Sequence, residues 1–172
     1  MIRYWTIYVF QFVFLILFQG LILNNIEING YINPYIYILL IIGLPYNLPK
    51  HIVLTIAFFT GLLVDLFTNT IGVHASASVF IGFLRPYIFK LIEPREGYED
   101  NKKPSVIDMG WKWFLSYCAI AVLIHHLFLF YVEAFSFKNF FLTFSRVILS
   151  AFFSIICIII AQLFTVPPNS KN

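Results

Sequence analysis

The stretch "LLVDLFTNTIGVHASAS", residues 62–78, joins two of the most apolar runs in this 172-residue chain. Asp65 lies one or two turns before the end of a membrane-length run, and His74 opens the next run. The residues between them are short and turn-forming, and Gly72 adds backbone freedom that other residues lack. The stretch therefore predicts a tight turn between two transmembrane helices, with ionisable side chains beside it.

The composition as a whole is that of a membrane protein. Hydrophobic residues make up 60% of the chain and charged residues only 11%, against roughly a quarter in soluble domains. The net charge of +3 is small and dispersed, which argues against a nucleic-acid partner and leaves membrane lipids as the expected surroundings. Two cysteines lie deep in apolar runs, where they are expected to act as small buried hydrophobes.

Six apolar segments indicate an all-α integral membrane protein, a compact bundle of about six transmembrane helices forming one polytopic domain over residues 1–172. The predicted spans are residues 4–23, 32–44, 51–67, 71–92, 109–132 and 140–166. The first has the basic start of a signal peptide but no small-x-small cleavage pattern, so a retained anchor is expected. The second is short and carries Pro34, so five spans with a re-entrant segment remain the alternative.

The basic residues predict the orientation of the bundle. With the N-terminus in the cytoplasm, nine of the eleven lysines and arginines fall on the cytoplasmic side. These nine are Arg3, Lys50, Arg85, Lys90, Arg95, Lys102, Lys103, Lys112 and Lys171. Both termini and the polar loop at residues 93–108 are therefore expected to be cytoplasmic, and Lys138 lies outside.

This orientation places the ionisable residues of the spans in the outer half of the membrane. Because such residues are costly in lipid, they usually face protein and find partners. We expect Asp65 to pair with Arg146 of the sixth span, with a histidine close by. Ala57, Gly61 and Asp65 recur every four residues, and such small-residue stripes mark close helix contacts. We expect this stripe to meet the small faces of the fourth and sixth spans.

The polar residues leave several interpretations open. A structural pair that fixes helix register is favoured over a proton or ion relay through Asp65 and the histidines. His125 and His126 are adjacent, so they point about 100° apart and cannot both face one metal; a haem held by His74 and one of them is a weaker alternative. The serines near His74 lack a Gly-x-Ser-x-Gly elbow. No catalytic, cofactor or metal residues are predicted, and we expect no enzyme activity.

The order of the parts resembles a known family. Gly61-x-x-x-Asp65, a short gap and Gly72-x-His74 at the start of the next span are similar to the rod-shape-determining MreD family. About 25 residues, "GLLVDLFTNTIGVHASASVFIGFLR", carry the resemblance, and size and span count extend it in architecture only. The chain departs from the family at Ile71, where relatives commonly have proline. Arg146 lies outside the matching motif, so the resemblance implies no role for it.

The resemblance implies a non-enzymatic, multi-pass scaffold of the bacterial inner membrane that acts in cell elongation. Its partners would be an MreC-like single-span protein, an MreB-like filament and the enzymes of peptidoglycan synthesis. Gly61, Asp65, Gly72 and His74 would then shape a partner-facing turn at the outer face. The family fold is also similar to the small-molecule-binding membrane subunits of vitamin transporters. A transport subunit that binds a small ligand is therefore the alternative function.

Overall fold

The computed structural model describes residues 2–26, 31–99 and 102–164, and its regular structure is helical. The elements are α1 (Ile2–Leu21), the 3-10 turn η1 (Leu23–Asn25), α2 (Leu39–Ile42), α3 (Lys50–Thr68), α4 (Val73–Leu91), α5 (Val106–Ala134) and α6 (Phe140–Leu163). Among the described residues, α3, α5 and α6 are long and apolar enough to cross a membrane. The prediction of an all-α fold with apolar helices of membrane-spanning length is confirmed for these three helices.

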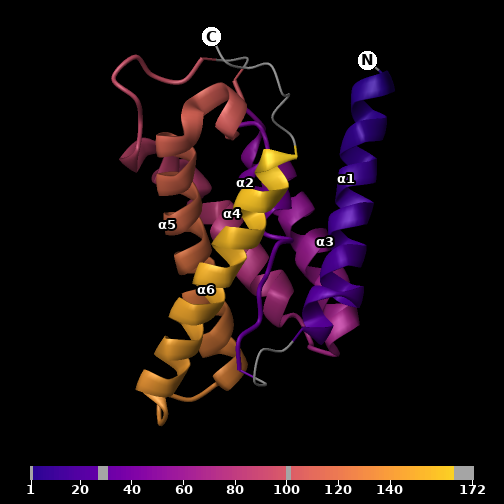
Figure 1. The fold of residues 1–172 in the computed structure, drawn as a ribbon, viewed down its shortest axis with the longest axis vertical. Helices are drawn as coiled ribbons and strands as arrows, with labels where there is room; N and C mark the ends of the chain where they lie inside the picture. Colours follow the sequence, from indigo (N-terminus) through magenta and orange to yellow (C-terminus); the bar gives the residue numbers. More distant parts are fainter. Residues whose placement is uncertain (1, 27–30, 100–101, 165–172) are drawn as a thin grey trace.

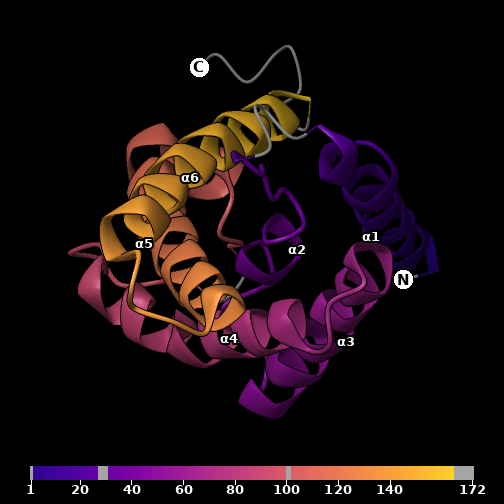
Figure 2. The same cartoon turned by 90° about the horizontal axis from the view of Figure 1, so that it is seen from below.

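The long helices form a ring around the short helix α2. Figure 2 shows α1, α3, α4, α5 and α6 arranged around α2. Neighbours in the ring mostly follow the chain: α3 packs against α1 and α4, α4 against α5, and α5 against α6. Helix α1 begins and α6 ends at the same end of the bundle (Figure 1). The turn between α3 and α4 lies at the opposite end.

Most predicted spans agree with the helices within a few residues. The range 51–67 corresponds to α3 and 71–92 to α4, while the last two residues of 140–166 lie outside the described part of the chain. Helix α5 starts before residue 109, because the Ser105 hydroxyl caps it by accepting the backbone N–H of Asp108 at 3.3 Å. The loop predicted at residues 93–108 is therefore shorter. Gly110, with φ at +79°, then kinks this helix.

The second predicted span is wrong as a transmembrane helix. Within residues 32–44 the only α-helix is α2, whose four residues rise about 6 Å, far less than a ~30 Å membrane core. The residues before it are extended or turn-forming, and Tyr37 and Ile38 are completely buried. This non-helical backbone is enclosed by the surrounding helices (Figure 2), the setting in which irregular chain is tolerated at membrane depth.

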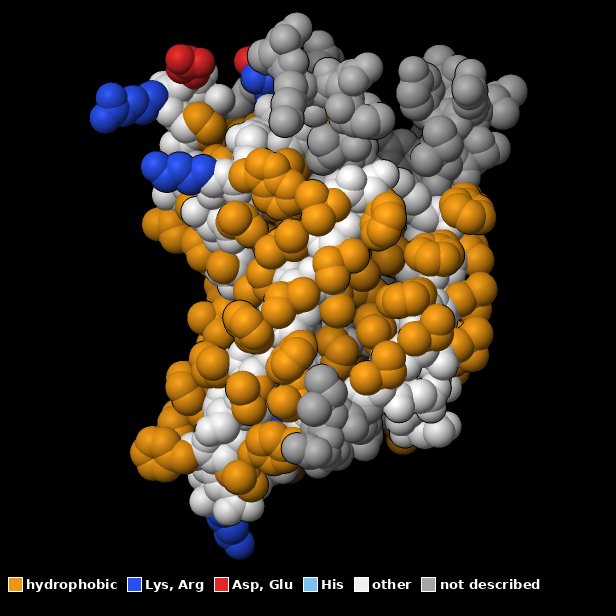
Figure 3. All heavy atoms as spheres, in the orientation of Figure 1, with side chains coloured by type: hydrophobic (Ala, Val, Ile, Leu, Met, Phe, Trp, Pro, Cys, Tyr) orange, Lys and Arg blue, Asp and Glu red, His pale blue; other side chains and the backbone are white. Residues whose placement is uncertain are grey.

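The outside of the bundle is apolar along its length. In Figure 3 hydrophobic side chains cover the middle of the visible face, and lysine, arginine and acidic side chains gather at its ends. Large hydrophobic residues such as Leu66, Leu91 and Phe141 are more than two-thirds exposed. An apolar surface of this extent is what a lipid-facing bundle presents.

Candidate functional site

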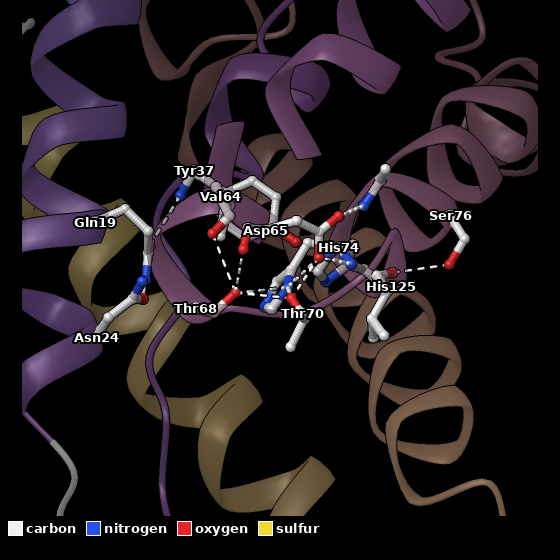
Figure 4. Close-up of polar contacts among 12 residues, drawn as sticks. Gln19, Asn24, Tyr37, Val64, Asp65, Thr68, Thr70, His74, Ser76 and His125 are labelled. Carbon is white, nitrogen blue, oxygen red and sulfur yellow. Dashed lines mark hydrogen bonds and ion pairs between the residues drawn. The ribbon is translucent and has the colours of Figure 1, made fainter. Parts of the chain in front are cut away.

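Asp65 lies in the last turn of α3 with 2% of its surface exposed. Both oxygens of its carboxylate accept hydrogen bonds from the α3–α4 turn and from the start of α4. Oδ1 accepts the hydroxyl of Thr70 at 2.5 Å and the backbone N–H of His74 at 3.0 Å. The Nδ1 atom of His74 lies 3.1 Å from the same oxygen. Oδ2 accepts the backbone N–H of Ala75 at 2.9 Å. Figure 4 shows Asp65, Thr70 and His74 grouped at this turn.

The Asp65 carboxylate acts as the N-cap of α4 from a different helix. Gly72 occupies the N-cap position with φ at +77°, and it has no side chain with which to accept the first N–H groups. Asp65 accepts two of them, and its negative charge lies at the positive end of the α4 dipole. One buried residue therefore joins the end of α3 to the start of α4.

Gly61 explains how the two helices come close enough for this contact. A Cβ atom at Gly61 would lie 2.4 Å from the backbone oxygen of His74 and 2.5 Å from the Cα of Ala75. Further along, a Cβ at Gly82 would lie 3.3 Å from the Cβ of Ala57. The predicted contact between the small faces of the third and fourth spans is therefore confirmed.

Arg146 does not belong to this cluster, and the predicted pair with Asp65 is wrong. Arg146 Nη1 instead lies 3.3 Å from Glu133 Oε2 at the end of α5, and its guanidinium lies 4.3 Å from the centre of the Phe130 ring. The reason is the order of helices in the ring. Helix α6 packs against α5, whereas α3 packs against α1 and α4.

His74 connects the capped turn to a buried group of aromatic rings. Its ring lies edge-on to Tyr35 at 5.3 Å and to Tyr37 at 5.9 Å. The Tyr37 hydroxyl lies 2.8 Å from Nε2 of His125, which is completely buried. Nε2 of His74 and Nδ1 of His125 are buried without a hydrogen-bond partner among the described residues. The expectation of a histidine beside Asp65 is confirmed, and the partner is His74.

His126 faces a different neighbour from His125. Its Nδ1 lies 2.8 Å from the carbonyl oxygen of Val122, and its Nε2 lies 3.0 Å from the hydroxyl of Ser154 on α6. The adjacent histidines thus point toward different neighbours, His125 toward Tyr37 in the segment before α2 and His126 toward Ser154 on α6, as their spacing predicts. Within the described ranges, no three histidine, cysteine or acidic residues gather in a way that could hold a metal ion.

Gln19 is a structural residue that sequence reasoning missed. Its Oε1 accepts the backbone N–H groups of Ile36 at 2.8 Å and Tyr37 at 3.4 Å, and its Nε2 donates to the Pro34 carbonyl at 3.1 Å. These bonds join α1 to the extended segment at residues 33–37. A glutamine inside an apolar span is the signal that could have identified it, because an amide in lipid needs partners.

The serines of α6 hold the same extended segment from the other side. Ser150 Oγ accepts the backbone N–H of Asn33 at 3.1 Å, and Ser154 Oγ accepts that of Tyr35 at 2.8 Å. The prediction that the small face of α6 meets the Ala57–Gly61–Asp65 stripe is therefore wrong. These serines satisfy backbone groups that extended chain leaves unpaired inside a membrane.

The polar groups of this site hold the α3–α4 turn together: carboxylate, hydroxyl and imidazole groups bind the backbone and one another across it.

Comparisons with protein-family models, with curated proteins and with solved structures find no match to this chain.

Proposed function

We propose that the protein is a non-enzymatic scaffold of the bacterial cell-elongation machinery, similar to the MreD family. One observation carries the proposal. Gly61, Asp65, Gly72 and His74, the residues on which the resemblance depends, lie together in one capped turn. Each has a part in holding α3 against α4, so the motif corresponds to a single rigid feature of the molecule.

The proposed topology puts this turn at the outer face of the inner membrane. Both termini and the loop before α5 are cytoplasmic, as the distribution of lysine and arginine favours. Five long helices cross the membrane, and the segment containing α2 lies inside the bundle rather than in contact with lipid. The outer loops are short, so the helix ends themselves offer the surface for a partner.

The partner that this function requires is an MreC-like single-span protein, with an MreB-like filament and wall synthases in the same assembly. The α3–α4 turn offers Ile71, whose side chain is fully exposed, beside the buried cluster. Because its side chain is exposed within this turn, Ile71 is the position at which contact of a partner with the turn can be tested.

The transport-subunit alternative requires polar groups that are free to bind a ligand. Asp65 accepts four hydrogen bonds from Thr70, His74 and Ala75, so its carboxylate is already satisfied. Arg146 lies beside Glu133, away from Asp65. The residues that would have formed a ligand site are thus dispersed or occupied, and the scaffold is the better-supported function.

Site-specific crosslinking in cells tests the proposal. A photoreactive amino acid at Ile71 is expected to crosslink to an MreC-like protein, and one at the exposed Leu91, at the other end of α4, is the matched control. Wall synthases are expected among proteins co-purified through a C-terminal tag. Recovery of an ATPase pair and a coupling subunit without shape proteins would support the transport alternative and overturn the scaffold.

A further inference from the structure

Arg85 is a buried cation that no described carboxylate neutralises. Its side chain is 3% exposed, although the distribution of basic residues placed it with the cytoplasmic charges. Nε donates to the Tyr117 hydroxyl at 3.2 Å, Nη2 donates to the carbonyl of Leu44, and the guanidinium lies 4.7 Å from the centre of the Phe89 ring. All three partners are neutral. An unpaired charge is costly inside a membrane protein and indicates a functional site.

A second cation shares a small cavity with Arg85. The cavity has a volume of about 60 Å³, and Lys50 and Arg85 both line it, with Val53, Gly82 and Phe89 among its apolar walls. This volume is well above the ~10–15 Å³ that one water molecule needs, so a compact polyatomic anion fits. Two positive side chains around such a space favour a phosphate group over a neutral ligand.

An apolar groove adjoins this cavity on the outside of the bundle. The groove has a volume of about 510 Å³ and runs between α3 and α4, with Leu54, Phe58, Val79 and Phe83 among its lining residues. Lys50 joins the two spaces, because its Nζ lies 4.0 Å from the centre of the Phe83 ring. A cationic pocket at the end of an apolar groove is complementary to an amphiphile with an anionic head.

We propose that Arg85 and Lys50 bind the phosphate of an anionic phospholipid whose acyl chain lies in the groove between α3 and α4. The negative charge of the phosphate complements the otherwise unpaired Arg85, and the small side chains of α4 leave space for the acyl chain. The site lies toward the end of the bundle where α3 begins, which the proposed topology makes the cytoplasmic leaflet. It depends on a membrane location but not on cell elongation or on any protein partner.

Lipid binding to the purified protein in a neutral detergent tests this site. Native mass spectrometry would compare dioleoylphosphatidylglycerol with dioleoylglycerol, which has the same chains and no phosphate. The wild type is expected to prefer the phospholipid at least fivefold. K50Q is expected to weaken phospholipid binding about fivefold, the effect of one cation near a membrane surface. K90Q removes one exposed charge from the same end of the bundle and is expected to leave binding unchanged.

Two further variants separate the head group from the chain. R85Q is expected to abolish the preference for phosphate; because Arg85 is buried and this variant can misfold, the exposed Lys50 provides the deciding measurement. V79W fills the groove and is expected to weaken phospholipid binding, whereas L66W on the exposed face of α3 is not.

Three results would overturn the proposal. If K50Q and K90Q weakened phospholipid binding equally, the binding would depend on general surface charge and not on this site. Equal binding of both lipids would leave no role for the phosphate. Displacement of the phospholipid by millimolar inorganic phosphate, with V79W binding normally, would make the site one for a free anion.

Discussion

The carboxylate of Asp65 on α3 accepts the backbone N–H of Ala75 in the first turn of α4, at 2.9 Å. Residues ten apart in the chain are thereby fixed to each other across a helix boundary. The bond replaces the N-cap that Gly72 cannot supply. Because Asp65 is buried, this contact is also isolated from water, which makes the loss of either partner expensive.

Asp65→Ala is therefore expected to destabilise the protein. It leaves the N–H groups of His74 and Ala75 without an acceptor, at a cost of about 1–3 kcal/mol each. Asp65→Asn keeps one acceptor oxygen, so its loss of stability should be smaller. Unfolding of the purified protein in mixed micelles with increasing SDS measures both.

Thr55→Ala is the matched control for these variants. Thr55 lies exposed on the same helix, and its hydroxyl bonds only the carbonyl of His51 one turn earlier. A change below about 0.5 kcal/mol is expected there. Equal unfolding midpoints for Asp65→Ala and Thr55→Ala would show that the cap does not stabilise the α3–α4 turn.

Gly61→Ala is expected to separate α3 from α4. The new Cβ would meet the backbone of His74 and Ala75, which cannot rotate away, so we expect a loss near the upper end of the ~1–3 kcal/mol range for overpacking. Gly20→Ala is the comparison, because its Cβ would meet only the Phe67 ring. A larger loss for Gly20→Ala in the same SDS titration would contradict the close helix contact.

Local spacing made the α3–α4 turn predictable from the sequence. Asp65 and His74 are separated by a gap too short for anything but a turn, so they had to be near each other. The helix ranges followed from apolar runs, and α3 and α4 agree with them closely. The predicted Asp65–Arg146 pair is wrong. Charge and membrane depth limit which residues can be partners, but they do not determine which helices are neighbours in the ring.

The extended segment was harder to predict for a different reason. A short apolar run such as residues 32–44 has the same composition whether it faces lipid as a helix or lies inside a bundle. What decides its conformation is a set of distant side chains. Gln19, Ser150 and Ser154 bind its backbone from residues 15–119 positions away in the chain.

Gln19→Leu is expected to release this segment. The change leaves the N–H of Ile36 and the carbonyl of Pro34 buried and unpaired, at a cost of about 1–3 kcal/mol each. Gln11→Leu makes the same substitution on an exposed face of α1 and should be neutral or stabilising in a lipid environment. A cysteine at Asn33 should react faster with a thiol reagent in Gln19→Leu than in Gln11→Leu. Equal rates would contradict the role of Gln19.

Arg146 and Glu133 should behave as a coupled pair, and Arg146 and Asp65 should not. A double-mutant cycle with Arg146→Gln and Glu133→Gln is expected to give a coupling below about 1 kcal/mol, because both side chains are partly exposed. The cycle that combines Arg146→Gln with Asp65→Asn should be additive within ~0.5 kcal/mol. Measurable coupling in the second cycle alone would restore the pair expected from the sequence and reject the helix order of this structure.

The proposed topology predicts which end of the bundle faces the cytoplasm. Lys90 lies in the last turn of α4 and Lys138 in the loop between α5 and α6, and both positions are exposed, so single cysteines there report on the two sides of the membrane in the proposed topology. A membrane-impermeant maleimide applied to intact spheroplasts is expected to label the cysteine at residue 138 and to label the one at residue 90 only after lysis. Because the outer position of the Asp65 turn, the cytoplasmic lipid site and the partner-facing role of Ile71 all follow from this orientation, labelling of residue 90 in intact cells would invert all three together. The hydrogen bonds of the capped turn would be unaffected, so the stability predictions for Asp65 and Gly61 can be judged separately.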